Sequence, residues 1–416
     1  MFHPDSQLLQ KFMKPIVKEY NKTNKKRILS PVSEIFLKKI LGWMEDAEDS
    51  FSNTTIQESV LDGLSKGKMH YHIPEKVMDH MERMRWIGKK LSFSIEKRTF
   101  HIFLLHPMKT YTTESEIYKW IENAKKRIYC WLYIASMEST KGCSKTMNIY
   151  LYLTDLKKKF PQKGETEILS EINVNTAYTF ACSLSETGEN EMYLYRKEEW
   201  FKVFIHETFH AFALDFANMR ETDADHQILR MFPLNIDLRL FETYTEMWAE
   251  TMNIIYIVHS SNIKNKMEKI VEYLKMEQLF SLFQALKVLK HNHISYEELY
   301  EMTERAKIKR VHHYKESTPV MAYYILKSIC MMNVGEFIEW TSMNNKGSLN
   351  FQKTKSNIDS FIGFIKERYK HEEFLEAMKF TENYYSLMKR KKMVGGFPTE
   401  NFDLLENLRM SMFEIE

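Results

Sequence analysis

The stretch Phe204–Phe212, FIHETFHAF, places His206, Glu207 and His210 in the spacing H-E-x-x-H. On an α-helix, residues four apart lie about 40° apart around the axis and about 6 Å along it, so both imidazoles can contact one ion. The carboxylate of Glu207 would lie beside that ion, where it can accept a proton from a water that the metal activates. The spacing therefore predicts a zinc ion bound by His206 and His210, with Glu207 as the catalytic base. A chance match on a buried helix is the competing interpretation.

The predicted helix around this motif, from about residue 198 to 217, is apolar over most of its length. Its apolar side chains are Trp200, Phe201, Val203, Phe204, Ile205, Phe209, Phe212 and Leu214. Ionisable side chains are costly to bury unless they coordinate or pair with something. This context favours a metal site over a chance match.

A second predicted helix, within residues 236–259, carries three further carboxylates. Glu242, Glu246 and Glu250 follow one another at four-residue steps in the apolar segment LRLFETYTEMWAETMNIIY. Because such residues lie on one face of a helix, one of them can supply the third ligand. Two imidazoles and one carboxylate leave the fourth position of a tetrahedral zinc ion open, as catalytic sites require.

H-E-x-x-H followed by a glutamate on a separate helix resembles the gluzincin class of zinc metallopeptidases. The segment EMWAE (246–250) is similar to the E-x-x-A-D pattern of the neprilysin and thermolysin-like families, with Glu where those families have Asp. The resemblance covers residues 170–252. It implies that Glu246 is the zinc ligand and that Glu250 accepts a hydrogen bond from His206. The alternative makes Glu242 the ligand and Glu246 the partner; the small Ala249 between the two carboxylates favours 246 and 250.

The segments around the motif predict a small mixed β-sheet. Residues 91–107 form two β-type runs around the polar EKR, typical of a hairpin, and residues 113–137 open with a Thr-x-x-Glu capping pattern and continue as a helix. Further strands are expected at 147–156, 171–183 and 191–195. We predict that Ile172–Phe180 is the edge strand beside the motif helix, where it can hold an extended peptide by main-chain pairing.

The expected fold is α+β and predominantly helical: a zincin-like catalytic core with a small mixed sheet and an active-site helix, flanked by helical regions. Helical periodicity of the apolar residues fills most of the chain outside this core. We expect a helical N-terminal region over 1–88, the core over 89–260, and a helical C-terminal region over 261–416 that completes the cleft.

Composition excludes several functional classes. Lys+Arg 59 against Asp+Glu 56 gives a net charge of only +3, too small to indicate a nucleic-acid or anionic-membrane partner. No secretory signal or membrane-spanning stretch is visible, so we expect a cytoplasmic protein. The cysteines at 130, 143, 182 and 330 have no C-x-x-C pair, which predicts neither a disulfide framework nor a thiolate zinc site and favours a reducing compartment.

The function expected from these features is zinc-dependent hydrolysis of peptide bonds in a peptide or protein substrate. A proton donor for the oxyanion could come from His312, His313, Tyr323 or Tyr324, although a core or surface role is the commoner one for such residues. The combination of EEWFKVFIHETFH with ETYTEMWAE also resembles proteins of large DNA viruses, which implies a virus-encoded and virion-associated protein. The alternative function is therefore a non-catalytic zincin-fold interaction or virion structural protein.

Overall fold

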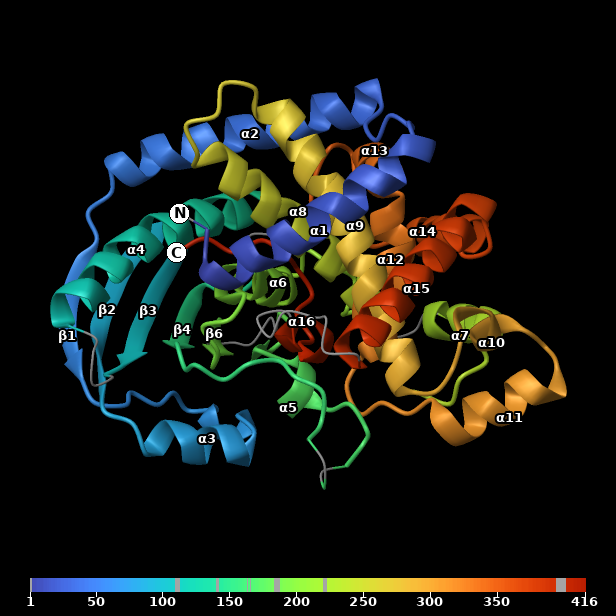
Figure 1. The fold of residues 1–416 in the computed structure, drawn as a ribbon. Coiled ribbons are helices and arrows are strands. Elements are labelled where there is room, and N and C mark those ends of the chain that lie inside the picture. Colours follow the sequence, from blue (N-terminus) through green and yellow to red (C-terminus); the bar gives the residue numbers. More distant parts are fainter. Residues whose placement is uncertain are drawn as a thin grey trace.

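The computed structural model describes residues 2–108, 113–139, 142–162, 164, 166–182, 188–219, 223–393 and 402–416. A six-stranded mixed sheet lies on one side of the molecule, and helices cover it and fill the other side (Figure 1). The fold is therefore of the mixed α+β kind.

The sheet has the strand order β1-β2-β3-β4-β6-β5. The pairs β1/β2, β2/β3 and β5/β6 are antiparallel, whereas β3/β4 and β4/β6 are parallel. The strands are β1 (Gln57–Asp62), β2 (Trp86–Ile95), β3 (Arg98–Pro107), β4 (Thr146–Tyr152), β5 (Ala177–Thr179) and β6 (Glu189–Leu194). Strand β5 is thus an edge strand, as predicted for this part of the chain.

The β2–β3 hairpin forms where the EKR sequence predicts it. Ile95 pairs with Arg98, so the turn consists of Glu96 and Lys97, and Glu96 adopts a positive φ of 54°. The helix α4 (Glu114–Glu138) then crosses over to the parallel strand β4 and begins with the predicted capping box of Thr113 and Glu116. Both local signals are confirmed.

Two predicted elements differ in the structure. The predicted strand 171–183 begins instead with the short helix α5 (Glu171–Val174), because Ser170 and Asn173 form a capping box. Of its described residues, only Ala177–Thr179 pair as a strand. The N-terminal region is also not wholly helical: the exposed, mostly polar QESVLD forms β1, and the boundary at residue 88 falls inside β2. A strand exposed on both faces lacks the apolar alternation by which it could be recognised.

The remaining helices surround the sheet and build the other half of the molecule (Figure 1). The N-terminal helices are α1 (Pro4–Thr23), α2 (Pro31–Ser52) and α3 (Glu75–Glu82), with a 3-10 turn, η1, at His70–His72. Later helices are α6 (Trp200–Ala211), α7 (Ala224–Met231), α8 (Leu240–His259), α9 (Lys266–His291), α10 (Tyr296–Tyr300), α11 (Glu304–His313), the π-helix η2 (Met321–Leu326), α12 (Lys327–Met332), α13 (Val334–Asn344), α14 (Lys355–Arg368), α15 (Glu372–Met393) and α16 (Phe402–Glu406). Among the described helices, none combines the length and apolarity needed to cross a membrane.

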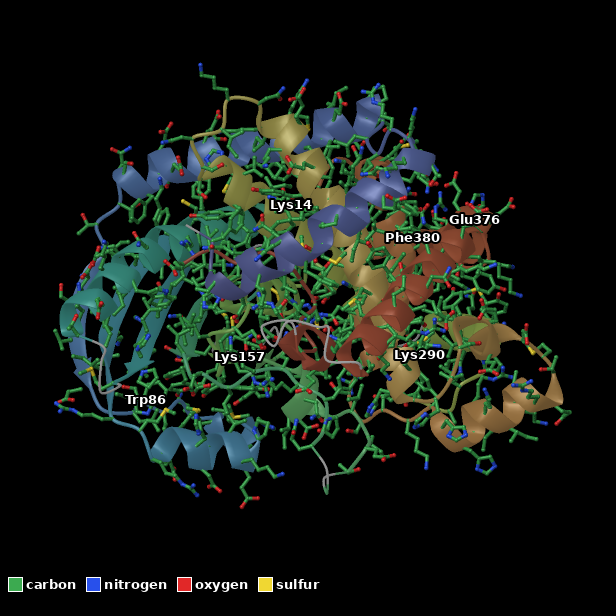
Figure 2. All side chains as sticks on the ribbon, viewed as in Figure 1. Lys14, Trp86, Lys157, Lys290, Glu376 and Phe380 are labelled. Atoms are coloured by element: carbon green, nitrogen blue, oxygen red, sulfur yellow. A yellow bond between two sulfur atoms is a disulfide. The ribbon has the colours of Figure 1, made fainter. Side chains whose placement is uncertain are left out.

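The two faces of the sheet pack against different parts of the chain. Alternate residues of β4, such as Ile149 and Leu151, join a large hydrophobic core with α4 and α6. Tyr150 and Tyr152 point to the opposite face, where α3 and its flanking residues cover them. Trp86, labelled in Figure 2, is buried on this second face, and its indole N–H donates to the Met81 carbonyl at 2.9 Å.

The large core joins all three predicted regions. It includes buried side chains from α1, β3, α6, α9 and the last residues of the chain, and side chains fill the space between these elements (Figure 2). The three regions therefore share one hydrophobic core. A domain has a core of its own, so the regions are parts of one folded unit.

Residues 407–413 run through the interior beside α6 and α9. Leu408, Met412 and Phe413 are buried. The carboxylate of Glu199 accepts from the backbone N–H of Met410 at 3.1 Å and of Ser411 at 2.6 Å, and Glu277 accepts from the N–H of Met412 at 3.0 Å. Buried carboxylates thus satisfy the backbone of this irregular segment.

Candidate metal centre

Three side chains from two helices meet in one compact cluster. The Nε2 atoms of His206 and His210 on α6 are 3.1 Å apart, and each lies 3.1 Å from Oε2 of Glu242 on α8. In a tetrahedral zinc site with bonds of about 2.0–2.1 Å, neighbouring ligand atoms are about 3.3 Å apart. The triangle of two nitrogens and one oxygen therefore fits a small divalent cation.

The same two histidines have carboxylate partners on their other nitrogen. Nδ1 of His206 donates to Oε2 of Glu246 at 2.7 Å, and Nδ1 of His210 donates to Oδ2 of Asp215. A proton held on Nδ1 leaves the lone pair of Nε2 directed at the centre of the cluster. Metal-binding histidines commonly have this arrangement, in which one ring nitrogen binds the ion and the other donates its N–H to a carboxylate.

The end of α6 brings Asp215 back towards His210. Ala213 adopts the left-handed conformation with φ of 50°, and the N–H of Leu214 donates to the Phe209 carbonyl at 2.8 Å. This ending turns the chain sharply, so that the next residue returns to the last turn of the helix. The helix is consequently shorter than the predicted 198–217.

The N-terminus of α8 is held in a similarly specific way. The carboxylate of Asp225 on α7 accepts from the N–H of Leu240 at 2.8 Å. Such a cap satisfies one of the free donors of the first turn and sets where the helix begins. Glu242, two residues later, thereby faces α6 at the level of both histidines.

The geometry favours the alternative assignment, with Glu242 as ligand and Glu246 as partner, over the one implied by the resemblance to the neprilysin and thermolysin-like pattern. Glu246 is the hydrogen-bond partner of His206, the role expected of Glu250, and Glu242 occupies the position expected of Glu246. Glu250 is instead fully buried and accepts from Nζ of Lys327 at 2.7 Å. The two nitrogens of His206 contact Glu246 and Glu242, which lie on successive turns of α8. The ligand and its partner glutamate are therefore each one turn earlier on α8 than the resemblance implied.

Glu207 lies beside the cluster and outside it. It lines the same hollow as His206 and His210, but it is absent from the group of converging ligand atoms. Burial raises the pKa of Glu207, while the two histidines counteract this. A carboxylate with a raised pKa is a better proton acceptor, as a general base requires.

The charges of the cluster attract a cation. Burial lowers the pKa of His210, but Glu242 and Asp215 outweigh it and hold that pKa well above its usual value. Burial raises the pKa of Glu242, but both histidines outweigh it and the net pKa is low. Either a proton or a divalent cation can supply the positive charge that this group favours, and the two compete for the same lone pairs.

A hollow of about 310 Å³ opens onto the cluster. Residues of β5, including Ala177 and Thr179, and residues of α6, including Val203 and Glu207, line it. Tyr178 of β5 stacks on Tyr193 of β6 with ring centroids 4.9 Å apart, which fastens the edge strand to the sheet. The predicted placement of an edge strand next to the motif helix is confirmed, over a shorter strand.

Of the four candidate proton donors, Tyr323 is the one beside the cluster of His206, His210 and Glu242. It lines the hollow from the π-helix η2, and its ring lies edge-on to that of His206 at 5.8 Å. Burial, together with Glu242 and Glu207, raises the pKa of Tyr323 well above its usual value, so the hydroxyl keeps its proton. Tyr324 points into the core and donates to the Leu408 carbonyl at 2.6 Å, and both histidines are exposed on α11.

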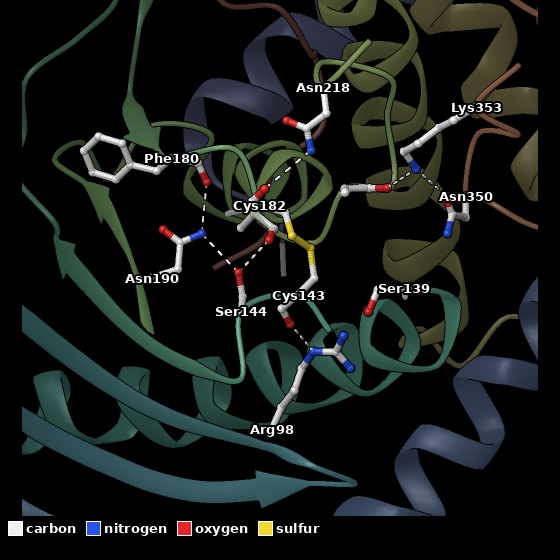
Figure 3. Close-up of a disulfide and its surroundings, with 12 residues drawn as sticks. Arg98, Ser139, Cys143, Ser144, Phe180, Cys182, Asn190, Asn218, Asn350 and Lys353 are labelled. Carbon is white, nitrogen blue, oxygen red and sulfur yellow. Dashed lines mark hydrogen bonds between the residues drawn. A yellow bond between two sulfur atoms is a disulfide. The ribbon is translucent and has the colours of Figure 1, made fainter. Parts of the chain in front are cut away.

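A disulfide joins Cys143 to Cys182 near the end of the edge strand (Figure 3). The sequence predicts none, because the two cysteines are 39 residues apart in no recognisable pattern. The N–H of Cys182 donates to the His210 carbonyl at 3.0 Å, and Oγ of Ser144 donates to the Ala211 carbonyl at 2.6 Å. The disulfide therefore joins the segment before β4 to the end of the edge strand, and the two hydrogen bonds hold both segments against the last turn of α6. The cysteines no longer support a reducing compartment.

Two residues of the site were not foreseen from the sequence. Asp215 follows His210 by five residues, and Lys202 precedes His206 by four and donates to Oε1 of Glu246 at 2.5 Å. The spacing of Lys202 places it on the same helix face as both histidines, which is a usable signal. The position of Asp215 depends on the left-handed conformation of Ala213, and alanine is not a residue type that predicts this conformation.

Comparisons of the chain with protein-family models, with curated proteins and with solved structures found no match. The interpretation of this centre therefore depends on its residues and their geometry.

Proposed function

We propose that the protein is a zinc-dependent peptidase. The observation that carries the proposal is the 3.1 Å triangle of His206, His210 and Glu242, with Glu207 next to it, on a hollow bounded by a sheet edge. Two nitrogens and one oxygen are the donor set of many catalytic zinc sites, and three protein ligands leave the fourth position open.

The residues of the chain have separate roles in this proposal. Bound zinc would polarise the scissile carbonyl and activate a water. Glu207 would accept the proton of that water and pass it to the leaving amine. The hydroxyl of Tyr323 would donate a hydrogen bond to the developing oxyanion, and the free edge of β5 would hold the substrate backbone in an extended conformation.

A non-catalytic zinc protein is the alternative, and two features favour catalysis over it. Structural zinc sites usually have four protein ligands, whereas the described residues converge here as three. A structural site also has no use for a buried carboxylate such as Glu207 that lines an adjoining hollow. Binding and hydrolysis can be separated experimentally.

The decisive variant is Glu207→Gln. We expect the purified protein to contain close to one zinc per chain and to hydrolyse peptides, and Glu207→Gln to keep the zinc while kcat/KM falls by about 10²–10⁴-fold. Glu171→Gln, which alters an exposed carboxylate of the same hollow, is the matched control and should keep both properties. Loss of zinc in Glu207→Gln, or full activity, would contradict the role of Glu207 as base.

A second variant separates Tyr323 from its neighbour. Removing one oxyanion donor typically lowers kcat by about 10²–10³-fold, and we expect this of Tyr323→Phe with KM nearly unchanged. Tyr324→Phe removes a hydrogen bond to Leu408 in the core and should lower stability without this effect on kcat. Equal kcat in the two variants would remove Tyr323 from the mechanism.

A further inference from the structure

The disulfide between Cys143 and Cys182 lies where three segments of the site meet (Figure 3). Cys143 precedes β4, and Cys182 follows β5. The N–H of Cys182 donates to the His210 carbonyl at 3.0 Å, and the hydroxyl of Ser144 donates to the Ala211 carbonyl at 2.6 Å. Each cysteine, or its neighbour in the chain, is thus hydrogen-bonded to the turn that carries a candidate metal ligand.

The edge strand depends on this junction because β5 itself is short. It pairs with β6 through three residues. Beyond them, the side chain of Asn190 donates to the Phe180 carbonyl at 3.0 Å and to Oγ of Ser144 at 3.1 Å, and the disulfide follows at Cys182 (Figure 3). Without the disulfide, hydrogen bonds alone would hold the end of this strand, and such contacts open locally with little cost.

The two bonded cysteines differ in exposure and in surroundings. Cys182 is partly exposed, whereas Cys143 is 1% exposed. Nε of Arg98 donates to the Cys143 carbonyl at 3.0 Å, so a positive charge lies beside the buried cysteine. Thiol–disulfide exchange is favoured when one sulfur can be attacked and the other leaves as a stabilised thiolate. Cys182 meets the first condition and Cys143 the second.

The other two cysteines are unsuited to exchange. Cys130 on α4 is 1% exposed, and Cys330 on α12 is fully buried. Burial raises the pKa of each of these thiols to about 12. The thiolate is the reactive form, and neither residue forms it to a useful extent near neutral pH. The chain therefore has one pair of cysteines open to exchange and two inert thiols.

We propose that Cys143 and Cys182 form a thiol-exchange site, at which a dithiol reductant breaks the disulfide and loosens both the edge strand and the last turn of α6. The inference rests on the proposed function, because it concerns the regulation of the same centre. The oxidised form holds the ligand-bearing turn and the edge strand in place. The reduced form binds zinc and substrate more weakly, so the protein is less active where dithiols are abundant.

The exchange is a two-electron reduction in two steps. A thiolate of the reductant attacks Sγ of Cys182, which forms a mixed disulfide and releases Cys143 as a thiolate. The second thiol of the reductant then attacks the reductant's own sulfur in that mixed disulfide and releases Cys182 as a thiolate. The reductant ends as an internal disulfide, and the protons of its two thiols pass to the two cysteines or to water.

The first experiment identifies the cysteines that exchange. Folded protein is treated with dithiothreitol and then with iodoacetamide, and the modified residues are located by mass spectrometry. We expect Cys143 and Cys182 to be alkylated, and Cys130 and Cys330 to stay unmodified until the protein is unfolded. A disulfide that resists reduction in the folded protein, or equal labelling of all four cysteines, would overturn the inference.

The second experiment compares the oxidised and reduced forms as zinc proteins. The reduced form is first transferred without oxygen to a buffer free of thiols, because thiols bind zinc themselves. We expect its zinc affinity, measured by competition with a chelator, to fall by about tenfold, the lower end of the loss typical of groups that orient a ligand. Hydrogen exchange should quicken at the amides of residues 178–182 and stay unchanged in α9. Reoxidation with oxidised glutathione should restore both properties.

Two double variants separate loss of the disulfide from other effects of the reductant. Cys143→Ser combined with Cys182→Ser should have the zinc affinity of the reduced form and should not respond to dithiothreitol. Cys130→Ala combined with Cys330→Ala keeps the disulfide and should respond as the original protein does. A double serine variant with the zinc affinity of the oxidised protein would contradict the proposal. The reduced original protein provides the same test if that variant does not fold.

Turnover distinguishes failure of this inference from failure of the proposed function. With zinc in excess, we expect the reduced form to have a lower kcat/KM than the oxidised form, chiefly through a higher KM, because the edge strand that holds the substrate is loosened. Equal zinc affinity and equal kcat/KM in the two forms would overturn the inference and leave the peptidase function intact. An oxidised, zinc-loaded protein that hydrolyses no peptide would contradict the proposed function itself.

Discussion

Helix α8 carries buried glutamates one turn apart, and those at the two ends of the series have different surroundings. Glu242 contacts two imidazoles and borders an open hollow. Glu250 is fully buried, and the ammonium of Lys327 lies 2.7 Å from its Oε1. Glu246, between them, contacts both a histidine and a lysine. Residues of one type and one spacing thus form a candidate metal site at one end and an ion pair at the other.

The surroundings of Glu242 and Glu250 differ in the group that supplies positive charge. A buried carboxylate is stable only when hydrogen bonds and an opposite charge compensate its lost hydration. Lys327 supplies that charge for Glu250, and Lys202 supplies it for Glu246. The imidazoles near Glu242 are neutral when they bind a metal, so the cation itself would supply the charge there.

The largest expected effect compares the two ends of the series directly. Glu242→Gln replaces an anionic ligand by a neutral one. We expect zinc affinity to fall by more than about 100-fold, the largest loss typical of a residue that only hydrogen-bonds a ligand. Glu250→Gln should keep zinc and lower the free energy of unfolding instead, by about 1–3 kcal/mol. Competition with a zinc chelator measures the first property, and urea unfolding measures the second. Loss of zinc in Glu250→Gln alone would restore the assignment implied by the gluzincin resemblance.

A smaller effect is expected from the carboxylates that hold the two histidines. Glu246→Gln and Asp215→Asn leave the ligands in place but weaken their orientation, so zinc affinity should fall by about 10–100-fold in each. The same chelator competition measures it. A fall as large as that of Glu242→Gln would mean that the changed residue binds the ion directly.

The smallest effect is a pH dependence of stability in the lysine-paired region. Burial raises the pKa of Glu277 to about 7, although Lys327 and the N–H of Met412 counteract this. Between pH 4.5 and 7 the folded protein therefore holds a proton that the unfolded chain has lost. This contribution to stability is complete below pH 4.5 and is lost as the pH rises through 7.

Glu277→Gln tests that titration. The variant cannot lose the proton, so its free energy of unfolding should fall less than that of the original protein between pH 4.5 and 7, by about 1–2 kcal/mol. Urea unfolding at several pH values, with zinc in excess, measures the difference. Parallel profiles for the two proteins would show that Glu277 has no such shift.

Local patterns predicted the parts of the site that lie on one helix. The spacing of His206, Glu207 and His210 is a property of α6 alone, and the capping box of Thr113 is likewise local. Local patterns could not show which glutamate of α8 faces both histidines. The other two, Glu246 and Glu250, bond to Lys202 and Lys327, which lie far away in the sequence. Residues four apart share one face of a helix, so the spacing alone does not show which of them lies opposite the histidines. That depends on the helices packed against α8.

The sheet shows the same limit. Strands with apolar alternation were found from the sequence, whereas β1 has no apolar alternation and is set by its pairing with β2. The edge strand was predicted too long because Ser170 starts a short helix first. The disulfide between Cys143 and Cys182 depends on how two loops meet at the end of α6, which no spacing in the chain encodes.

The buried segment 407–413 has a consequence for the order of events during synthesis. Glu199 and Glu277 obtain their backbone donors from Met410, Ser411 and Met412, which are made long after α6 and α8. At a synthesis rate of about 5–20 residues per second, the interval from α8 to this segment is about 10–30 s. During that time the helices that carry the candidate metal ligands lack part of their interior. We therefore expect the candidate centre to mature only when most of the chain has left the ribosome, so that a nascent chain does not encounter the finished centre.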